Sequence, residues 1–249
     1  MSAPFLLLST RPELEASQAE YNSFLSMMEL EADQLHHIRV DQAPLPQIRL
    51  EEYSGIVIGG GPFNTTSPEK SNLQVRVERE LAELIRDVVK QDFPLFAACY
   101  GIGLFGLALG GVVDRTYGEA PGCITIEATE AGAQDPLLEG MPNSFTSIVG
   151  HTEACTELPD NATVLLQGAA CPVQMYRVGR NVYATQFHPE LEVETFAQRL
   201  RIYRDNGYYP PEEYQRIVDE ARAADLTVDN QLLLNFRKRF ERALTPVTS

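Results

Sequence analysis

The sequence predicts an α/β fold around a mainly parallel β-sheet, and two observations carry this prediction. Up to about residue 109, short apolar runs alternate with amphipathic stretches, which is the pattern of consecutive β-α-β units. Two of the runs, IVI at 56–58 and LFAA at 95–98, are apolar at every position. Strands that are covered by helices on both faces have this composition.

The elements of the first half follow from local patterns. PFLLLS predicts the first strand, and a helical pattern follows it to about Leu30. IRV and YSGIVIGGG predict the second and third strands. We expect a long helix from about Ser71 to Gln91, a strand at FPLFAA and a helix from about Ile102 to Leu109.

The second half changes character twice. Between about residues 122 and 186 the chain has strand-like pieces with little helical periodicity, namely CITIEAT, FTSIVG, ATVLLQGA, PVQMYRVG and NVYATQF. These predict an antiparallel excursion or sheet edge. After Pro189 the pattern is helical again. We therefore divide the chain into a main domain, 1–204, and a C-terminal helical extension, 205–249, that packs on the core or on a partner.

Charge and hydropathy exclude several classes of function. The formal net charge is −15, whereas proteins that bind nucleic acid neutralise phosphates with clustered Lys and Arg. Nucleic acid is therefore not an expected partner. The apolar run PFLLL near the start is too short for a signal-peptide core or a membrane span. We expect a cytoplasmic protein that has no membrane partner.

The cysteines and histidines show no metal-ligand spacing. The four cysteines (Cys99, Cys123, Cys155 and Cys171) form no CxxC pair, and they stand at no ligand spacing from the four histidines. We predict neither a metal site nor a disulfide framework. His36 and His37 are adjacent, and we expect them on the surface near a helix end.

Cys99 stands where a strand is expected to turn into a helix, in FPLFAACYGIGLFGLALGG. Ligands of open α/β sheets bind beyond the carboxyl ends of the strands. Gly101 and Gly103 permit a tight, strained turn like the serine elbow of hydrolases. The start of the following helix should lower the pKa of the thiol. A nucleophile is one interpretation of this cysteine, and a small buried core residue is the other.

His188 and Glu190 supply what a nucleophile needs. They lie two residues apart in YATQFHPELE, on either side of a proline. In an extended segment such residues face the same side, so the carboxylate can orient the imidazole. An imidazole that serves a thiol and is oriented by a carboxylate is the general nucleophile, base and orienter arrangement. We predict a Cys99–His188–Glu190 triad.

A glycine run at the end of another predicted strand, IVIGGGP, completes the candidate site. Such a turn exposes backbone N–H groups, so Gly60 or Gly61, together with Tyr100 N–H, are candidates for binding an oxyanion. The run matches neither GxxxxGK[ST] nor GxGxxG with a following acidic residue, which argues against phosphate binding. An ordinary tight turn is the other interpretation.

Together these motifs resemble class I glutamine amidotransferases, in particular the glutaminase domain of GMP synthetase and its stand-alone relatives. IVIGGGP, PLFAACYGIGLFGLALGG and ATQFHPELE occur in the family's order, and the resemblance covers roughly residues 5–204. It implies a flavodoxin-like αβα sandwich, with Cys99 as nucleophile, His188 as base and then acid, and Glu190 as its orienter. In the family, the cysteine attacks the side-chain amide of glutamine, releases ammonia and forms a γ-glutamyl thioester that water hydrolyses.

The sequence departs from the family pattern in two ways. Gly103 stands where the family usually carries the glutamine of CxGxQ, whose side chain helps to hold the substrate. With Gly103 we expect an opened pocket that admits a γ-glutamyl peptide or a modified glutamine. The chain also has no SGGxDS motif of an ATP-pyrophosphatase. Any synthase activity should therefore come from a separate synthase subunit.

A further stretch, SIVGHTEACTELPDNATVLLQ, resembles a family segment in which a histidine and an acidic residue precede Leu-Pro. The resemblance makes His151 and Glu153 candidates for reading the amino group of the substrate or a glycyl extension of it, and a solvated loop is the alternative. Tyr117 and Glu119 are placed like the family's Glu-Tyr-Gly neighbourhood.

Three functions follow as hypotheses. The first is hydrolysis of glutamine to glutamate and ammonia, by a stand-alone glutaminase or an amidotransferase subunit. The second is hydrolysis of γ-glutamyl peptides by the same triad. The third is a binding protein whose triad is vestigial. The thiol chemistry requires no cofactor, and the expected partners are a small γ-glutamyl substrate and either a synthase subunit or a second copy of the chain.

Overall fold

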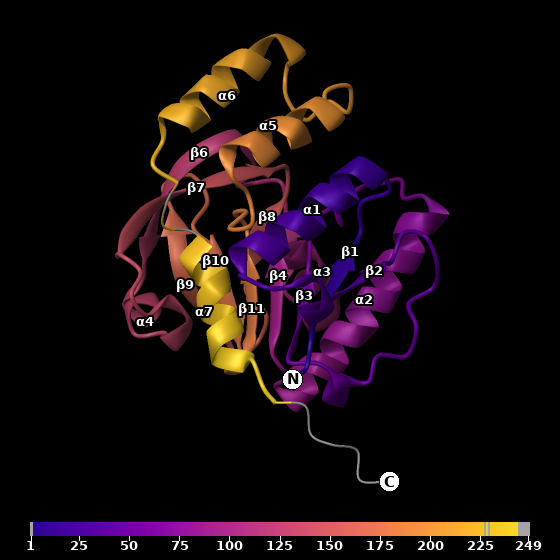
Figure 1. Cartoon of the computed structure of the whole chain (residues 1–249). Helices are drawn as coiled ribbons and strands as arrows, with labels where there is room; N and C mark the ends of the chain where they lie inside the picture. The colour runs from indigo at the N-terminus through magenta and orange to yellow at the C-terminus, as the bar shows by residue number, and fades with distance from the viewer. Residues whose placement is uncertain (1, 227, 229, 244–249) are drawn as a thin grey trace, which may run out of the picture.

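A computed structural model describes residues 2–226, 228 and 230–243. In this part of the chain, nine strands form one sheet in the order β2-β1-β3-β4-β11-β10-β9-β6-β7, and β5 pairs with β8 in a small second sheet. Helices cover both faces of the large sheet, and α5 and α6 lie above it (Figure 1). The predicted α/β fold with a mainly parallel centre and an antiparallel edge is confirmed.

The elements have the following bounds. The strands are β1 (Phe5–Ser9), β2 (Leu35–Arg39), β3 (Gly55–Ile58), β4 (Leu95–Ala98), β5 (Val112–Asp114), β6 (Glu119–Ala128), β7 (Ser144–His151), β8 (Ala154–Glu157), β9 (Ala162–Gly168), β10 (Met175–Val178) and β11 (Val182–Thr185). The α-helices are α1 (Leu14–Met27), α2 (Asn72–Gln91), α3 (Tyr100–Leu109), α4 (Glu130–Ala133), α5 (Val193–Ile202), α6 (Tyr214–Ala223) and α7 (Asn230–Phe240).

The parallel part of the sheet has the flavodoxin-like order. Its five strands, β2-β1-β3-β4-β11, follow one another as second, first, third, fourth and fifth. The segment NVYATQF was predicted with the antiparallel pieces, and this was wrong. It contains β11, which pairs in parallel with β4 and antiparallel with β10. The antiparallel excursion therefore ends by returning the chain to the centre of the sheet.

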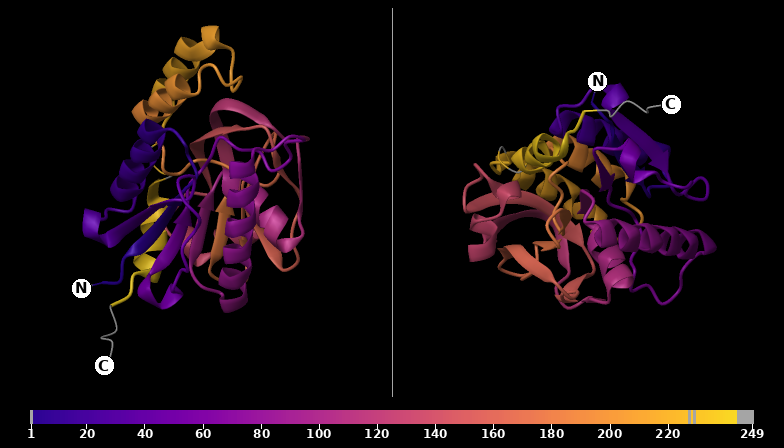
Figure 2. Two further views of the ribbon diagram at one scale, coloured as in Figure 1. Left: turned by 90° about the vertical axis from the view of Figure 1, so that its right-hand side faces the viewer. Right: turned by 90° about the horizontal axis from the view of Figure 1, so that it is seen from below.

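Alternating side chains divide the core into two layers. Phe5 and Leu7 of β1 contribute to one buried cluster with residues of α1 and α7. Leu6 and Leu8 contribute to the other, with residues of α2 and α3. Figure 2 shows α1 and α7 on one side of the sheet and α2 on the other. Because β-strand side chains point alternately to opposite faces, each apolar position of β1 is buried.

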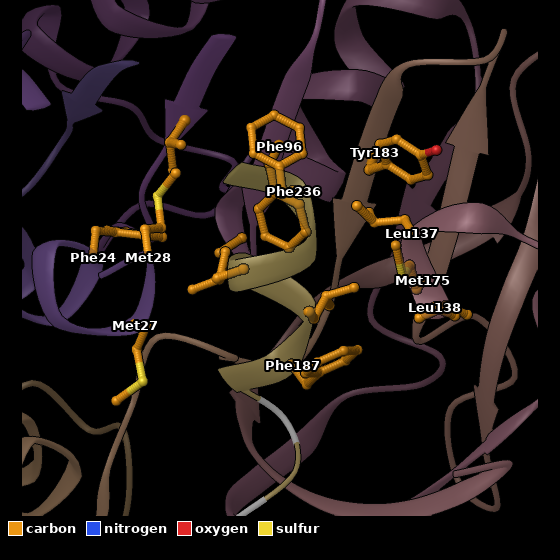
Figure 3. Close-up of a cluster of buried hydrophobic side chains, with 14 of the residues drawn as sticks. Phe24, Met27, Met28, Phe96, Leu137, Leu138, Met175, Tyr183, Phe187 and Phe236 are labelled. Atoms are coloured by element: carbon orange, nitrogen blue, oxygen red, sulfur yellow. The ribbon is translucent and has the colours of Figure 1, made fainter. Parts of the chain in front are cut away.

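Helix α7 supplies part of the central core. Its Phe236 is fully buried, and its ring lies 6.0 Å from the ring of Phe5 and 5.7 Å from that of Phe96. Figure 3 shows Phe236 of this helix next to Phe96, within the cluster that also contains Phe187. Helix α7, which lies in the predicted C-terminal extension, thus contributes to the same core as the strands of the main domain.

Two local predictions have different outcomes. Helix α2 has the expected bounds, because the Ser71 hydroxyl caps it by accepting a hydrogen bond from Gln74 N–H at 3.1 Å. His36 and His37 lie in β2, shortly after the end of a 3-10 helix at Ala32–Gln34. His36 is exposed, whereas His37 is half-buried and stacks on Tyr21.

No helix among the described residues is both long and apolar enough to cross a bilayer.

Candidate active site

The three sequence motifs meet because they follow three neighbouring parallel strands. Ile58 of β3 is paired with Ala97 of β4, and Ala98 of β4 with Thr185 of β11. At this carboxyl edge of the sheet, the glycine run directly follows Ile58 and Cys99 directly follows Ala98. His188 stands three residues after Thr185. The N–H of Cys99 donates to the carbonyl of Thr185 at 2.7 Å, which ties the two turns together.

Cys99 has the strained backbone that the sequence predicts. Its φ of 49° and ψ of −87° lie in a region that residues with a side chain seldom adopt. Such a conformation costs about 1–3 kcal/mol and requires support from its surroundings. The supporting helix α3 can approach β4 only because Gly101 has no side chain, since a Cβ there would lie 2.3 Å from Ala97 Cβ.

The predicted contact between His188 and Glu190 is present. His188 Nδ1 lies 2.8 Å from Glu190 Oε1, and both side chains are buried. The local geometry differs from the prediction, because these residues form a turn after β11 and not an extended segment. The turn is closed by Leu191 N–H, which donates to the His188 carbonyl at 3.2 Å.

The neighbours of His188 fix its protonation pattern. Glu190 is an acceptor, so Nδ1 carries the proton of a neutral imidazole and Nε2 keeps its lone pair. Arg199 of α5 donates through Nη1 to the same Glu190 oxygen at 3.1 Å, and this Nη1 also lies 3.1 Å from His188 Nδ1. The result is an oriented imidazole whose second nitrogen can accept a proton.

Burial is the largest single influence on the pKa of His188 and of Glu190, but it decides the direction of the shift only for His188. It lowers the pKa of His188 below the ordinary histidine value, although Glu190 opposes this. It also raises the pKa of Glu190, but the charges of His188 and Arg199 outweigh burial and bring this pKa to about 2. At neutral pH the imidazole is therefore neutral and the carboxylate is ionised.

The predicted lowering of the Cys99 pKa is wrong. Burial raises the pKa of this thiol to about 12, and the opposing effect of the Arg11 guanidinium is smaller. The helix start after Cys99 does not compensate for the loss of water around the sulfur. The thiol is therefore protonated at rest, and a thiolate forms only when a base removes the proton.

The candidate oxyanion donors differ in position. Gly61 and Tyr100 line the pocket that contains Cys99, whereas Gly60 is buried and is not among the lining residues. The Gly60 carbonyl accepts a hydrogen bond from the Thr10 hydroxyl at 3.1 Å. Tyr100 is the first residue of α3, so its N–H has no acceptor within the helix. Of the two glycines, Gly61 is the better placed donor.

The pocket has a volume of about 140 Å³ and lies among residues from both halves of the chain. Its lining residues are Arg11, Gly61, Pro62, Phe63, Asn64, Cys99, Tyr100, Gly150, His151, Thr152, Glu153, Gln186, His188, Arg199, Tyr203, Asn206, Gly207 and Tyr208. Gln186 Nε2 lies 4.0 Å from Cys99 Sγ. The Tyr208 hydroxyl donates to the Gly150 carbonyl at 2.6 Å and so ties residues 206–208 to β7.

Gly103 does not open the pocket as predicted. It is absent from the lining, and a Cβ at this position would lie 2.7 Å both from Glu153 Oε1 and from Thr65 Oγ1. The Glu153 carboxylate accepts hydrogen bonds from Thr65 N–H, the Thr65 hydroxyl and Thr66 N–H, at 2.8, 2.9 and 2.9 Å. The space freed by Gly103 is therefore filled by a rigidly held acid that itself faces the pocket.

His151 also lines the pocket, but both of its ring nitrogens are engaged. Nδ1 lies 3.0 Å from the Glu153 carbonyl and Nε2 lies 2.8 Å from Glu119 Oε2. Glu119, His151 and Cys171 bring their polar atoms within 4.8 Å of one another. Cysteine and histidine spacing could not indicate this group, because its members come from three separate segments. No disulfide joins the four cysteines, all of which lie in the described ranges.

Several pocket residues were missed by sequence reasoning. Arg11 follows β1, Arg199 belongs to α5, and Tyr203 and Tyr208 follow α5. None belongs to a motif with a chemical signature. For Arg11 one signal was available, because a polar residue directly after a buried strand of a parallel sheet lies at the binding edge.

Comparisons with known proteins agree on one family. The family model for "Glutamine amidotransferase class-I" matches residues 16–202. A GMP synthase (glutamine-hydrolyzing) of Streptomyces avermitilis is 25% identical over 206 residues, which is 81% of this chain but 37% of that protein. The chain thus spans about a third of the length of this relative.

Other relatives match over their whole length. Gamma-glutamyl peptidase 4 of Arabidopsis thaliana is 25% identical over 245 residues, which is 94% of this chain and 95% of that protein. The crystal structure of a glutamine amidotransferase from Thermotoga maritima superposes with a TM-score of 0.76 at 20% identity, covering 96% of this chain and 98% of the other. At that identity the structural likeness shows the fold alone.

Proposed function

Because the chain belongs to the class-I glutamine amidotransferase family, we propose that it hydrolyses γ-glutamyl amide bonds through a covalent thioester on Cys99. The observation that carries this proposal is the pocket itself. It holds a thiol on a strained turn and an imidazole oriented by a buried carboxylate, with one ring nitrogen left to accept a proton. This is the arrangement that nucleophilic catalysis requires.

The first half of the reaction forms the thioester. His188 Nε2 takes the proton of the Cys99 thiol as the sulfur attacks the γ-carbonyl carbon of the substrate. Gly61 N–H and Tyr100 N–H donate to the oxygen that becomes negative. His188 then gives its proton to the leaving nitrogen, the C–N bond breaks, and ammonia or an amine departs.

The second half regenerates the thiol. A water molecule gives a proton to His188 Nε2 while its oxygen attacks the thioester carbon. The C–S bond breaks, glutamate leaves, and the proton on His188 returns to the sulfur. Because the resting thiol has a pKa of about 12, each turnover depends on His188 as a base in both steps.

Glu153 and His151 are proposed to hold the γ-glutamyl group. Three donors fix the Glu153 carboxylate, and an ionised carboxylate offers about four acceptor positions. One position is therefore left for the α-ammonium group of the substrate. His151 is proposed to support this acid, because its Nδ1 lies against the Glu153 carbonyl.

Hydrolysis of γ-glutamyl peptides is the second candidate. It is favoured by the relative named gamma-glutamyl peptidase 4, which matches this chain over nearly its full length. The relatives named GMP synthase instead favour glutamine as substrate and a synthase subunit as partner. Both candidates use the same thioester, so the chemistry on Cys99 is common to them.

The proposal is tested by intact-protein mass spectrometry. The purified protein is mixed with glutamine and a panel of γ-glutamyl peptides, quenched in acid within the first turnovers and weighed. We expect a γ-glutamyl adduct that maps to Cys99 and is missing in Cys99→Ala. If no compound gives an adduct or is turned over, the chain is a binding protein with a vestigial triad and the proposal is wrong.

A further inference from the structure

Arg11 presents an unused donor to the pocket. Its side chain is 3% exposed and is held on two sides, by Nε donating to Glu20 Oε1 at 2.9 Å and by Nη1 donating to the Tyr203 hydroxyl at 3.1 Å. Its Nη2 makes no hydrogen bond within the described part of the chain. Since Arg11 lines the pocket, a substrate bound there can contact its side chain.

Buried contacts hold the side chain of Arg11 in this position. Glu20 is fully buried beside Gly59, where a Cβ would lie 2.3 Å from its carboxylate oxygen. A larger residue at this position would displace the acid that holds the guanidinium. A fixed guanidinium with one nitrogen left over can donate a charge-assisted hydrogen bond to a carboxylate.

Nη2 of Arg11 lies near the imidazole of His188. A Cβ built on Gly60 would lie 2.7 Å from Arg11 Nη2 and 3.1 Å from His188 Cε1. The two groups therefore lie within about 6 Å of each other, since both are close to one point. His188 is the group that protonates the leaving nitrogen, so Arg11 is near that nitrogen's substituents.

The acid of the pocket lies elsewhere. Glu153 packs against Gly103, one helical turn beyond Cys99 on α3. A γ-glutamyl group whose ammonium binds Glu153 extends from α3 to the sulfur, and whatever is attached to its γ-nitrogen continues past His188. The two charged groups thus contact different ends of the substrate.

We propose that Arg11 Nη2 binds a carboxylate on the leaving amine, so that the preferred substrate is a γ-glutamyl amino acid and not glutamine. This proposal rests on the proposed function and specifies its substrate class. In an α-amino acid the carboxylate oxygens lie about 2.7–3.6 Å from the amino nitrogen. An amine nitrogen beside the imidazole can therefore carry a carboxylate that reaches Arg11. Ammonia has no group that uses this site.

The first test needs only the unaltered protein and two substrates. γ-Glutamyl-glycine and γ-glutamyl-glycinamide have nearly the same size, and only the first has a carboxylate on the leaving amine. We expect kcat/KM for γ-glutamyl-glycine to be at least about tenfold higher, which is the effect of one charge-assisted hydrogen bond. Equal kcat/KM values for the two compounds would overturn the proposal.

The second test removes the guanidinium that is proposed to bind the carboxylate. The variant Arg11→Gln is combined with Glu20→Gln, so that no buried charge is left unpaired. The ratio of kcat/KM between the two substrates should fall toward one in this double variant. Arg76→Gln is the matched control, because Arg76 pairs with Glu80 on α2 and does not line the pocket, and it should keep the wild-type ratio.

The two proposals fail in different ways. If the wild-type protein forms the Cys99 adduct from both compounds and does not discriminate between them, the carboxylate site is wrong and the thioester chemistry stands. If the double variant keeps the full ratio, another residue reads the carboxylate. If neither these compounds nor glutamine gives an adduct, the proposed function fails and the substrate class fails with it.

Discussion

The described part of the chain contains two cysteine–histidine–glutamate groups, and they differ in the second ring nitrogen of the histidine and in the position of the sulfur. In the first, His188 bonds to Glu190 at 2.8 Å and shares a pocket with Cys99. In the second, His151 lies 2.8 Å from Glu119, and Cys171 is within 4.8 Å of both. Both histidines are buried. The inventory of residue types is therefore the same in the two groups.

The first difference is whether the second ring nitrogen of the histidine has a hydrogen-bond partner. His188 has one carboxylate on Nδ1, which leaves Nε2 to accept a proton, whereas His151 has an acceptor on each side. The sulfurs differ too, since Cys99 lines the pocket on a strained turn and Cys171 is fully buried outside the lining. A nucleophile, a base and a carboxylate within reach are thus not sufficient. The base needs a free nitrogen and the sulfur needs access to a substrate.

The largest expected effect compares the two cysteines. Cys99→Ala should lower kcat/KM for a γ-glutamyl substrate by at least about 10⁴-fold, because no other group can form the thioester. Cys171→Ala should keep kcat/KM within about threefold and lower the free energy of unfolding by about 1 kcal/mol, because it leaves a small cavity. Steady-state kinetics and denaturant unfolding measure both. Comparable kinetic losses in the two variants would remove the distinction between the groups.

Substitution of the two histidines should affect different properties, namely the catalytic rate for His188 and the stability for His151. His188→Asn should lower kcat by about 10²–10⁴-fold with little loss of stability, because it removes the base. His151→Asn should act mainly on stability, by about 1–3 kcal/mol, because Glu119 loses its buried partner. Thermal unfolding followed beside the kinetics separates these outcomes. A stable His151→Asn protein without activity would show that His151 has a direct catalytic role.

The pH dependence of kcat/KM tests the protonation states of His188 and Cys99. Protonated His188 cannot act as a base, and its pKa is lowered by burial, so kcat/KM should rise with pH below about pH 6.5 and then stay level. The Cys99 pKa of about 12 predicts no further change up to about pH 9. A profile of kcat/KM between about pH 5 and about pH 9 is the measurement. A bell shape with a limb near pH 8 would show that the thiol ionises on its own.

The smallest expected effect concerns Arg199, which we infer to be a positioning residue. Its charge contributes to lowering the pKa of His188, so Arg199→Met should move the acidic limb of the profile to higher pH. Arg199→Lys keeps the charge and should move the limb less. If the limb does not move in Arg199→Met, the pKa of His188 does not depend on this contact.

Much of the candidate catalytic group could be predicted from sequence, because each of its residues lies in a short motif next to a predicted strand. Cys99, His188 and the glycine run each follow an apolar strand, and parallel strands bring their carboxyl ends to one edge. The fold class followed from the same alternation. The family resemblance supplied the chain order of the motifs.

The rest depends on contacts between distant segments. Glu153 fills the space beside Gly103 from another part of the chain, and Tyr208 reaches the pocket from beyond α5. The resting state of Cys99 depends on its burial, which the sequence pattern does not determine. The Glu119–His151–Cys171 group and the position of the Arg11 guanidinium arise in the same way, from side chains that only the completed fold brings together.

Site-specific labelling tests the central claim most directly. The protein is incubated near neutral pH with 6-diazo-5-oxo-norleucine, a glutamine-like electrophile, and the modified residue is identified by peptide mapping, with His188→Asn treated in parallel. We expect one label per chain on Cys99 in the wild-type protein and strongly slowed labelling in the variant. A label on Cys171, or equal labelling of Cys99 with and without His188, would contradict the account.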